Sequence, residues 1–131
     1  MNLFMVKIAP RRGRLKEILD ILESVRGPTL AASGCLECSI WQEQGEERAI
    51  VYLERWQLRA DMIEHVRSPL YGRVLTAMEL SERPPEICFY EICGTEGMEL
   101  IEGVRSPPGN GCVGGQVIPF NGKPGTKGER T

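Results

Sequence analysis

The sequence predicts an α+β fold in which helices cover one face of an antiparallel sheet. Segments with a strand period and segments with a helix period follow each other in the order β-α-β-β-α-(α)-β. The second and third strand segments are separated only by a turn at residues 44–47, which is typical of an antiparallel hairpin. The length of 131 residues corresponds to one domain. Together these observations indicate the ferredoxin-like split βαβ arrangement.

The chain begins with a strand and an amphipathic helix. Residues 3–8 are a short apolar run, broken only by Lys7, that ends at Ala9-Pro10. Gly27-Pro28 is expected to stop or kink the helix that follows, and residues 29–33 then form either its last turn or a loop. The apolar face of this helix consists of Leu15, Ile18, Leu19, Leu22 and Val25.

The next segment is the predicted hairpin. Residues 35–44 alternate in polarity, with Leu36, Cys38 and Ile40 on one side of the strand. Residues 48–56 form the partner strand, because they are rich in residues that favour extended structure.

From Leu58 onward the apolar pattern becomes helical again. Ser68-Pro69 ends the first of two helices, because the residue before a proline avoids the α conformation. A further helix runs from Leu70 until Arg83-Pro84-Pro85, and residues 87–93 form the last strand. The apolar stripes of these helices are Leu58, Met62, Ile63 and Val66, and then Leu70, Val74, Leu75 and Met78.

The C-terminal part of the chain is less regular. Residues 98–104 fit either a short edge strand or one helical turn, and the strand is favoured. From residue 106 glycine and proline become frequent, and apolar groups are too few to offset the entropy lost on ordering. The prediction is therefore a domain at residues 1–105 and a Gly/Pro-rich tail at residues 106–131.

Composition excludes several functional classes. The net charge is −2 and the basic residues are dispersed, so no nucleic-acid partner is expected. No apolar run approaches the roughly 18 residues needed to span a bilayer, so no membrane partner is expected. The N-terminus lacks the pattern of a signal peptide, and a cytoplasmic location is expected.

Five cysteines are present, and Cys35 and Cys38 form a CxxC motif. A zinc site would require a second pair of ligands, and a redox pair usually lies at the start of a helix. The motif instead falls in a strand pattern, where alternation would place the two side chains on opposite faces. Structural thiols are therefore favoured, and no metal is expected.

Both faces of the predicted sheet are apolar. Two or three helices from a chain of this size cannot cover both faces. A homodimer formed through the uncovered face by a two-fold axis is the simplest solution. The strand residues that leave no polar face are Phe4, Val6, Cys38, Ile40, Val51 and Leu53.

Three stretches carry a resemblance to a known family. They are the helix ahead of Gly34-Cys35-Leu36-Glu37-Cys38, then Glu54-Arg55-Trp56, then His65-Val66-Arg67-Ser68-Pro69-Leu70-Tyr71. In these stretches the sequence resembles the antibiotic biosynthesis monooxygenase family, whose members are dimeric α/β barrels. The family includes cofactor-free oxygenases of phenolic and anthrone-like aromatics, quinol oxygenases, haem-degrading proteins and members with no known activity.

The sequence departs from the haem-degrading branch of this family. That branch places an iron-binding histidine in the helix that corresponds to residues 70–80, where this chain has no histidine and Leu75 occupies the expected position. The departure argues against haem, and the remaining resemblance implies that no cofactor is needed.

His65 and Glu54 are the candidate catalytic residues. His65 is the only histidine in the chain, and an imidazole can take and return a proton at neutral pH, as a general base on a phenol must. Glu54 could orient His65 or bridge to arginines across a dimer, because a carboxylate inside a sheet is costly unless it is paired. Alternatively, His65 only fixes its helix to the sheet.

Trp56, Tyr52 and Tyr71 are the candidate substrate-binding residues. Trp56 could stack on a flat aromatic ligand, Tyr52 shares its strand face, and Tyr71 could donate to a ligand carbonyl. With these residues the resemblance implies a cofactor-independent monooxygenase that oxidises a phenolic, quinol or anthrone-like substrate with dioxygen. The alternative is a non-catalytic dimeric barrel that binds a small apolar ligand.

Overall fold

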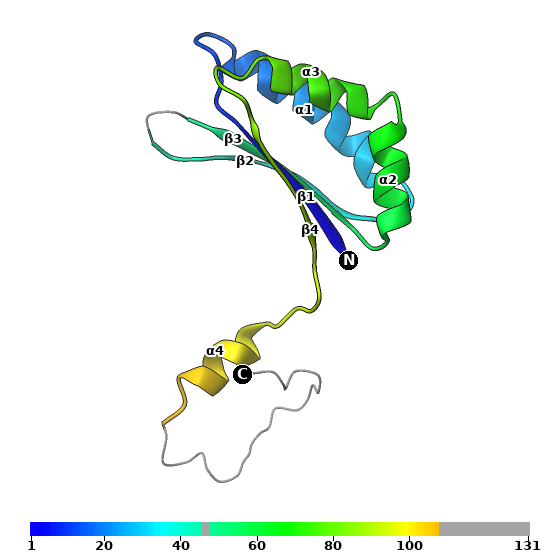
Figure 1. The fold of residues 1–131 in the computed structure, drawn as a ribbon. Helices are drawn as coiled ribbons and strands as arrows, with labels where there is room; N and C mark the ends of the chain where they lie inside the picture. Colours follow the sequence, from blue (N-terminus) through cyan, green and yellow to red (C-terminus); the bar gives the residue numbers. More distant parts are fainter. Residues whose placement is uncertain (46–47, 108–131) are drawn as a thin grey trace. The chain divides into compact units, whose positions relative to one another are not determined.

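Four strands make one antiparallel sheet in the order β2-β3-β1-β4 (Figure 1). The computed structural model describes residues 1–45 and 48–107, so most of the predicted Gly/Pro-rich tail, with Cys112, lies outside the described residues. β1 pairs antiparallel with both β3 and β4 and is therefore central. The strands are β1 (Asn2–Ile8), β2 (Cys35–Gln42), β3 (Ile50–Trp56) and β4 (Glu86–Glu91).

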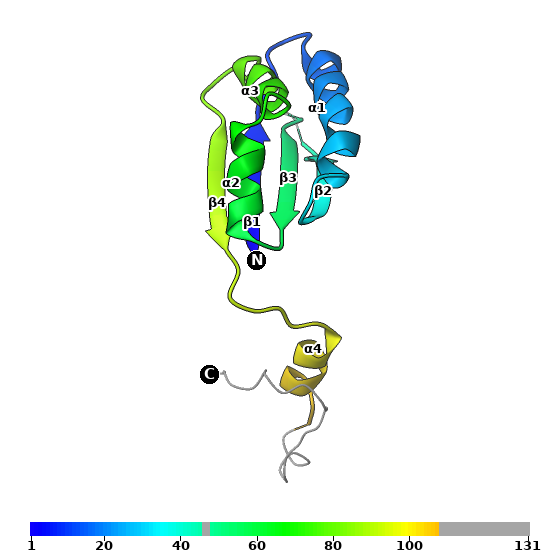
Figure 2. The same ribbon diagram turned by 90° about the vertical axis from the view of Figure 1, so that its right-hand side faces the viewer.

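Three helices cover one face of this sheet, as Figures 1 and 2 show from two directions. They are α1 (Leu15–Leu30), α2 (Arg59–Arg67) and α3 (Tyr71–Glu79). The predicted α+β class with helices on one face is confirmed, as is the hairpin formed by β2 and β3. The sheet and these helices belong to the unit Met1–Cys93, and residues from Gly94 onward form a second unit. Among the described residues, no helix has the length and apolar character required to cross a membrane.

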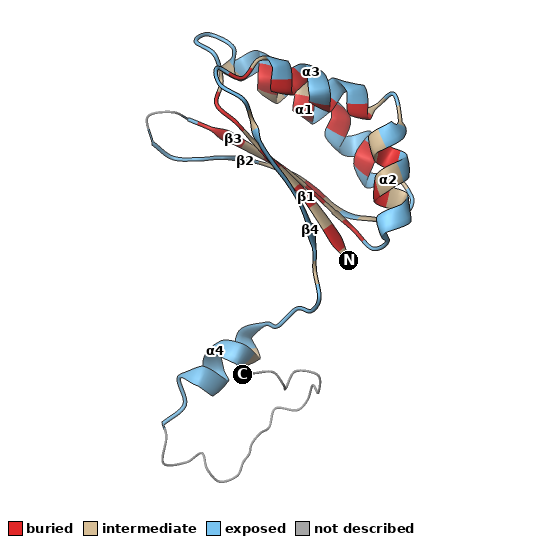
Figure 3. Ribbon diagram, in the orientation of Figure 1, coloured by how far each residue is buried: buried red, intermediate tan, exposed pale blue. Residues whose placement is uncertain are grey.

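The hydrophobic core lies between the sheet and the helices that cover it (Figure 3). Along β1, Phe4, Val6 and Ile8 are fully buried and the residues between them are only half-buried, as the two-residue period of a strand requires. The buried side chains of α1 and α3 that join this core are Ile18, Leu22, Val25, Tyr71, Val74, Ala77 and Met78.

Helix α1 continues through Gly27-Pro28, where the sequence predicted a stop or a kink. Proline removes one helical hydrogen bond, but only two residues remain before the helix ends at Leu30, so little helix is lost. Thr29, in this last turn, is fully buried.

The apolar stripe predicted for α3 is partly wrong. Leu75 was assigned to the buried face, but it is 49% exposed. Tyr71 and Ala77 take part in the core together with Val74 and Met78. The helical spacing places Tyr71, Val74 and Met78 on one face, and Leu75 lies outside it.

A β-bulge corrects the expected geometry of the CxxC motif. The pairing of β2 with β3 shifts between Cys35 and Glu37, so that Cys35 lies opposite Trp56 and Cys38 lies opposite Glu54. Trp56 and Glu54 are two residues apart on one strand and share a face. Both cysteines therefore point to the helix side of the sheet, and the prediction of opposite faces is wrong.

Residues Met98–Val104 form the helix α4 and not the edge strand that was favoured. Met98, Ile101 and Val104 recur every three residues, which is a helical spacing, and no strand pairs with this segment among the described residues. The backbone N–H of Gly97, which precedes the helix, donates to the Glu99 carboxylate at 3.0 Å.

Candidate functional site

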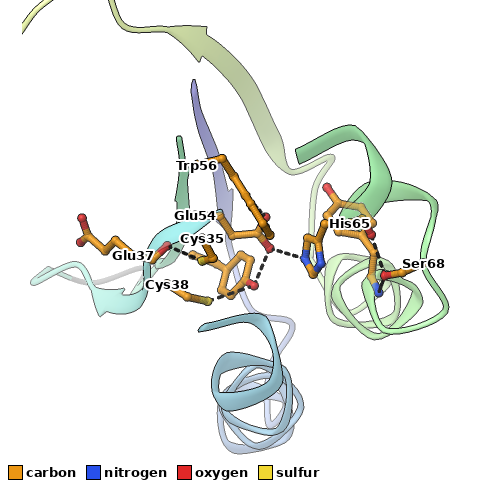
Figure 4. Close-up of polar contacts among 9 residues, drawn as sticks. Cys35, Glu37, Cys38, Glu54, Trp56, His65 and Ser68 are labelled. Atoms are coloured by element: carbon orange, nitrogen blue, oxygen red, sulfur yellow. Dashed lines mark hydrogen bonds and ion pairs between the residues drawn. The ribbon is translucent and has the colours of Figure 1, made fainter. Parts of the chain in front are cut away.

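A carboxylate, Glu54, is fully buried in the middle of β3 on the face that the helices cover. It accepts three hydrogen bonds, and Figure 4 shows the donors converging on it. Tyr52 Oη donates to Oε2 at 2.6 Å, Trp56 Nε1 donates to Oε1 at 3.0 Å, and His65 Nε2 lies 3.0 Å from Oε2. An ionised carboxylate is an acceptor only, so this set of donors fits the charged form and compensates its burial.

The strand period explains why three of these side chains meet. Tyr52, Glu54 and Trp56 alternate with outward-facing residues and all point to the helix side. The fourth residue, His65, comes from α2, which follows β3 directly and returns across its end. Contact between Glu54 and His65 is one of the two alternatives that the sequence offers for this carboxylate, and the structure brings the two side chains together.

The end of α2 fixes the backbone of His65. Ser68 is in extended conformation before Pro69, and its Oγ donates to the His65 carbonyl oxygen at 2.7 Å. The imidazole is buried and lies 5.0 Å from the Trp56 ring and 5.5 Å, edge to face, from the Tyr71 ring. Its position is therefore set by the backbone below it and by rings on both sides.

The hydrogen bond to Glu54 determines the tautomer of His65. Because the carboxylate only accepts, Nε2 carries a proton, and in the neutral form of the ring the lone pair is therefore on Nδ1. No side chain or backbone group within residues 1–45 and 48–107 bonds to Nδ1. The site thus presents one basic nitrogen without a partner, backed by a buried negative charge.

Tyr71, the first residue of α3, packs its ring against the imidazole of His65. Burial, and secondarily the charge of Glu54, raises the pKa of Tyr71 well above its ordinary value, so the hydroxyl remains a donor. No hydrogen-bond partner for Tyr71 Oη exists in the described part of the chain. All five residues proposed from the sequence therefore lie together, four in one hydrogen-bond network and Tyr71 against His65.

Two participants were not recognised from the sequence. Phe89 of β4 lies 4.8 Å, ring to ring, from the core residue Phe4, which itself contacts Tyr71. The register of β4 with β1 puts Phe89 opposite Phe4 on the helix side, and the strand pattern alone does not give this register. Cys38 is the second, because its thiol donates to Tyr52 Oη at 3.2 Å from its place opposite Glu54.

The thiols of Cys35 and Cys38 are poor nucleophiles, because their raised pKa values keep them protonated. Burial raises the pKa of Cys38 to about 12, and burial also raises the pKa of Cys35, whose Sγ donates to the Glu37 carbonyl oxygen. In the part of the chain that the structure covers, no group of three or more His, Cys, Asp or Glu side chains is arranged to hold a metal.

Comparisons with known proteins place this fold. A curated relative, the uncharacterised protein sll1783 of Synechocystis, is 24% identical over 92 residues, which cover 70% of this chain and 61% of the relative. The chain thus spans about three fifths of that relative's length. Rv0793 from Mycobacterium tuberculosis has 23% identity and a TM-score of 0.65 over 73% of this chain and 98% of its own. A conserved protein from Methanosarcina mazei has 22% identity and a TM-score of 0.63, over 70% and 92%.

A family assignment follows from the sequence comparison. The model of the family described as antibiotic biosynthesis monooxygenase matches residues 1–77, which is more than half of the 131-residue chain. The matched part contains Glu54, His65 and all three aromatic residues of the site. The chain therefore belongs to the antibiotic biosynthesis monooxygenase family.

Proposed function

We propose that this protein is a cofactor-independent monooxygenase that oxidises a phenolic, quinol or anthrone-like aromatic with dioxygen. Family membership supports a general monooxygenase-like role. The observation that carries the finer proposal is the state of His65, whose Nε2 is held by Glu54 while Nδ1 has no partner among the described residues. This is the arrangement of a general base with an orienting carboxylate.

In the proposed mechanism His65 Nδ1 takes the proton of the substrate. The imidazolium that forms is stabilised by the Glu54 carboxylate at 3.0 Å, and the protein dielectric around this buried pair strengthens that attraction. Glu54 does not need to accept the proton, because its oxygens are already occupied by three donors. The pair therefore separates charge without reorganising the site.

The deprotonated aromatic then supplies the electrons. It is rich enough in electrons to reduce dioxygen directly, and a carbon–oxygen bond forms at the ring carbon. When a methylene carbon becomes a carbonyl, one oxygen atom enters the product and the other leaves as water, so the substrate provides all four electrons. The protonated His65 returns its proton to the departing oxygen.

Each of the three aromatic residues has its own role in the proposed mechanism. Tyr71 Oη, which keeps its proton, donates to the oxyanion that develops on the substrate. Trp56 and Tyr52 both donate hydrogen bonds to Glu54, so we assign to them the role of positioning the carboxylate. The Trp56 ring, which lies beside the imidazole, also supplies apolar surface next to the base.

We further propose that the active form is a homodimer. The sheet face opposite the helices carries apolar side chains with nothing over them within the described unit, among them Trp41 at 59% exposure. A second copy related by a two-fold axis would bury this face. The apolar residues on it are Leu3, Met5, Trp41, Val51, Leu53 and Tyr90.

Oxygen uptake with a panel of hydroquinones and anthrones tests the proposed reaction. We expect uptake by the wild-type protein and a loss of roughly 100-fold or more in His65→Ala, since general-base catalysis contributes about 10²–10⁴-fold. Arg67→Ala is the matched control, because Arg67 lies on the same helix, is exposed and pairs with the exposed Glu64. No uptake by the wild type on any compound would reject the oxygenase.

The second candidate is a non-catalytic barrel that binds a small apolar ligand. It is favoured by the fact that His65 ties α2 to β3 through Glu54, a contact that has structural value without any chemistry. Ligand-induced quenching of tryptophan fluorescence without oxygen uptake would identify this case.

A further inference from the structure

The hydrogen-bond network of the site extends beyond Glu54 to strand β2. The Cys38 thiol donates to Tyr52 Oη at 3.2 Å, and Tyr52 donates to the Glu54 oxygen that also faces His65. Cys38 is 3% exposed and Tyr52 is fully buried, so no bulk water competes for these bonds. A thiol thus forms the outer end of a chain that runs from β2 to the imidazole (Figure 4).

Two features place this thiol. Cys38 lies in the regular part of the β2–β3 ladder, directly opposite the buried Glu54, and therefore points to the helix side. Arg26 of α1 donates from Nε to the Cys38 carbonyl oxygen at 3.1 Å, which fixes the backbone at this position.

We propose that Cys38 is a positioning residue: its thiol occupies a lone pair of the Tyr52 hydroxyl, commits the Tyr52 proton to Glu54, and so holds the carboxylate oxygen that fixes His65. The inference rests on the proposed roles of Glu54 and His65. It assigns to a residue of the CxxC motif a part in the site that does not involve redox chemistry or metal binding.

The physical argument concerns the direction of each bond. A hydroxyl has one proton and two lone pairs, and the thiol, as a donor, can only approach a lone pair. Burial and the nearby carboxylate raise the pKa of Tyr52 far above its ordinary value, so its proton stays on the oxygen and points to Glu54. Bonds in such a chain polarise one another, each strengthening the next by roughly 10–30%.

The single histidine makes the test direct. Because His65 is the only histidine in the chain, tag-free protein labelled with ¹⁵N-histidine gives one Nε2–H signal, without assignment. Its proton shift and its exchange with solvent report the strength of the bond to Glu54. Cys38→Ala removes the donor, and Cys38→Ser retains one.

Cys35→Ala is the matched control. Cys35 lies on the same strand and the same face, but its thiol donates to the Glu37 carbonyl oxygen and does not contact Tyr52. We expect Cys38→Ala to speed exchange of the Nε2 proton by about two- to fivefold and to move its shift toward a weaker bond. Cys35→Ala should leave both unchanged, and Cys38→Ser should restore most of the wild-type signal.

The result that overturns the inference is equally specific. If Cys38→Ala lowers the melting temperature but leaves the Nε2–H signal as in wild type, the thiol only fills space. The measurement of the Nε2–H signal needs no substrate and is therefore independent of the oxygen-uptake assay. An absence of oxygen uptake by the wild type would reject the proposed reaction but not the positioning role of Cys38.

Discussion

Replacing Glu54 by glutamine tests whether the buried site depends on an acceptor-only group. The carboxylate receives two donors, from Tyr52 and His65, on one oxygen and a third donor, from Trp56, on the other. An amide of the same shape has one oxygen and one NH₂ group. With its oxygen toward Tyr52 and His65, its NH₂ must face the Trp56 N–H at 3.0 Å, donor against donor.

The magnitude can be worked from these contacts. One buried donor left without an acceptor costs about 1–3 kcal/mol, and each of the two remaining bonds weakens by about 1 kcal/mol when its acceptor loses its charge. Relief of the buried charge offsets part of this loss. We therefore expect the free energy of unfolding to fall by about 2–3 kcal/mol, which corresponds to about 10–20 °C in melting temperature for a domain of this size.

Urea denaturation at pH 7 measures this change. Glu37→Gln is the control, because Glu37 is a half-exposed carboxylate of the neighbouring strand that pairs with Arg55, and its loss should cost less than about 1 kcal/mol. If Glu54→Gln lowers stability by no more than the control, the carboxylate is not the acceptor of three donors and the reasoning about the His65 tautomer is refuted.

Three further predictions concern the strand start, the thiol and the open sheet face. Gly34→Ala should destabilise more than Gly13→Ala, because both have positive φ but only at Gly34 would the added β-carbon overlap a side chain of α2; equal losses in denaturant would contradict this. The pKa of Cys38 is raised from 9.0 to about 12, so the folded state retains a proton that the unfolded chain loses, and stability should fall as pH rises from 9 toward 12. Cys38→Ser should lose less stability than the wild type between pH 9 and 10 in denaturant unfolding. Parallel curves of stability against pH for the two proteins would count against burial of the thiol. Trp41→Arg should yield monomers in sedimentation experiments while Leu75→Lys, on the helix side, should not; a dimer that survives Trp41→Arg would exclude this face as the interface.

Much of the site could be predicted from sequence because its residues obey simple periods. Tyr52, Glu54 and Trp56 are spaced by two and must share a face of β3. A helix that begins three residues later returns over that face, so His65 had to approach it. The single histidine and the single carboxylate on that face then had few other partners, and the sequence indicated that Glu54 could orient His65.

The parts that could not be predicted depend on contacts distant in sequence. The bulge lies where Cys35 pairs with Trp56 and Glu37 pairs with Arg55. Strict alternation, which ignores the bulge, predicts the wrong face for Cys35. Helix α1 continues past Pro28 to Leu30 with Thr29 buried, and residue propensity does not reveal this burial. Phe89 became visible only through the register of β4 with β1.

The burial of Glu54 carries an energetic cost that an apolar side chain would not. Burial of a carboxylate costs several kcal/mol before its hydrogen bonds are counted, and even a buried ion pair can often be replaced by packed apolar side chains with a neutral effect or a stabilisation of about 1–4 kcal/mol. Leucine at positions 54 and 65, with phenylalanine at position 52, would satisfy the same β3 pattern and the same core without any buried charge. The fold therefore does not require this cluster. What the cluster provides, and an apolar core would not, is one nitrogen with a free lone pair held beside a buried negative charge and a protonated tyrosine.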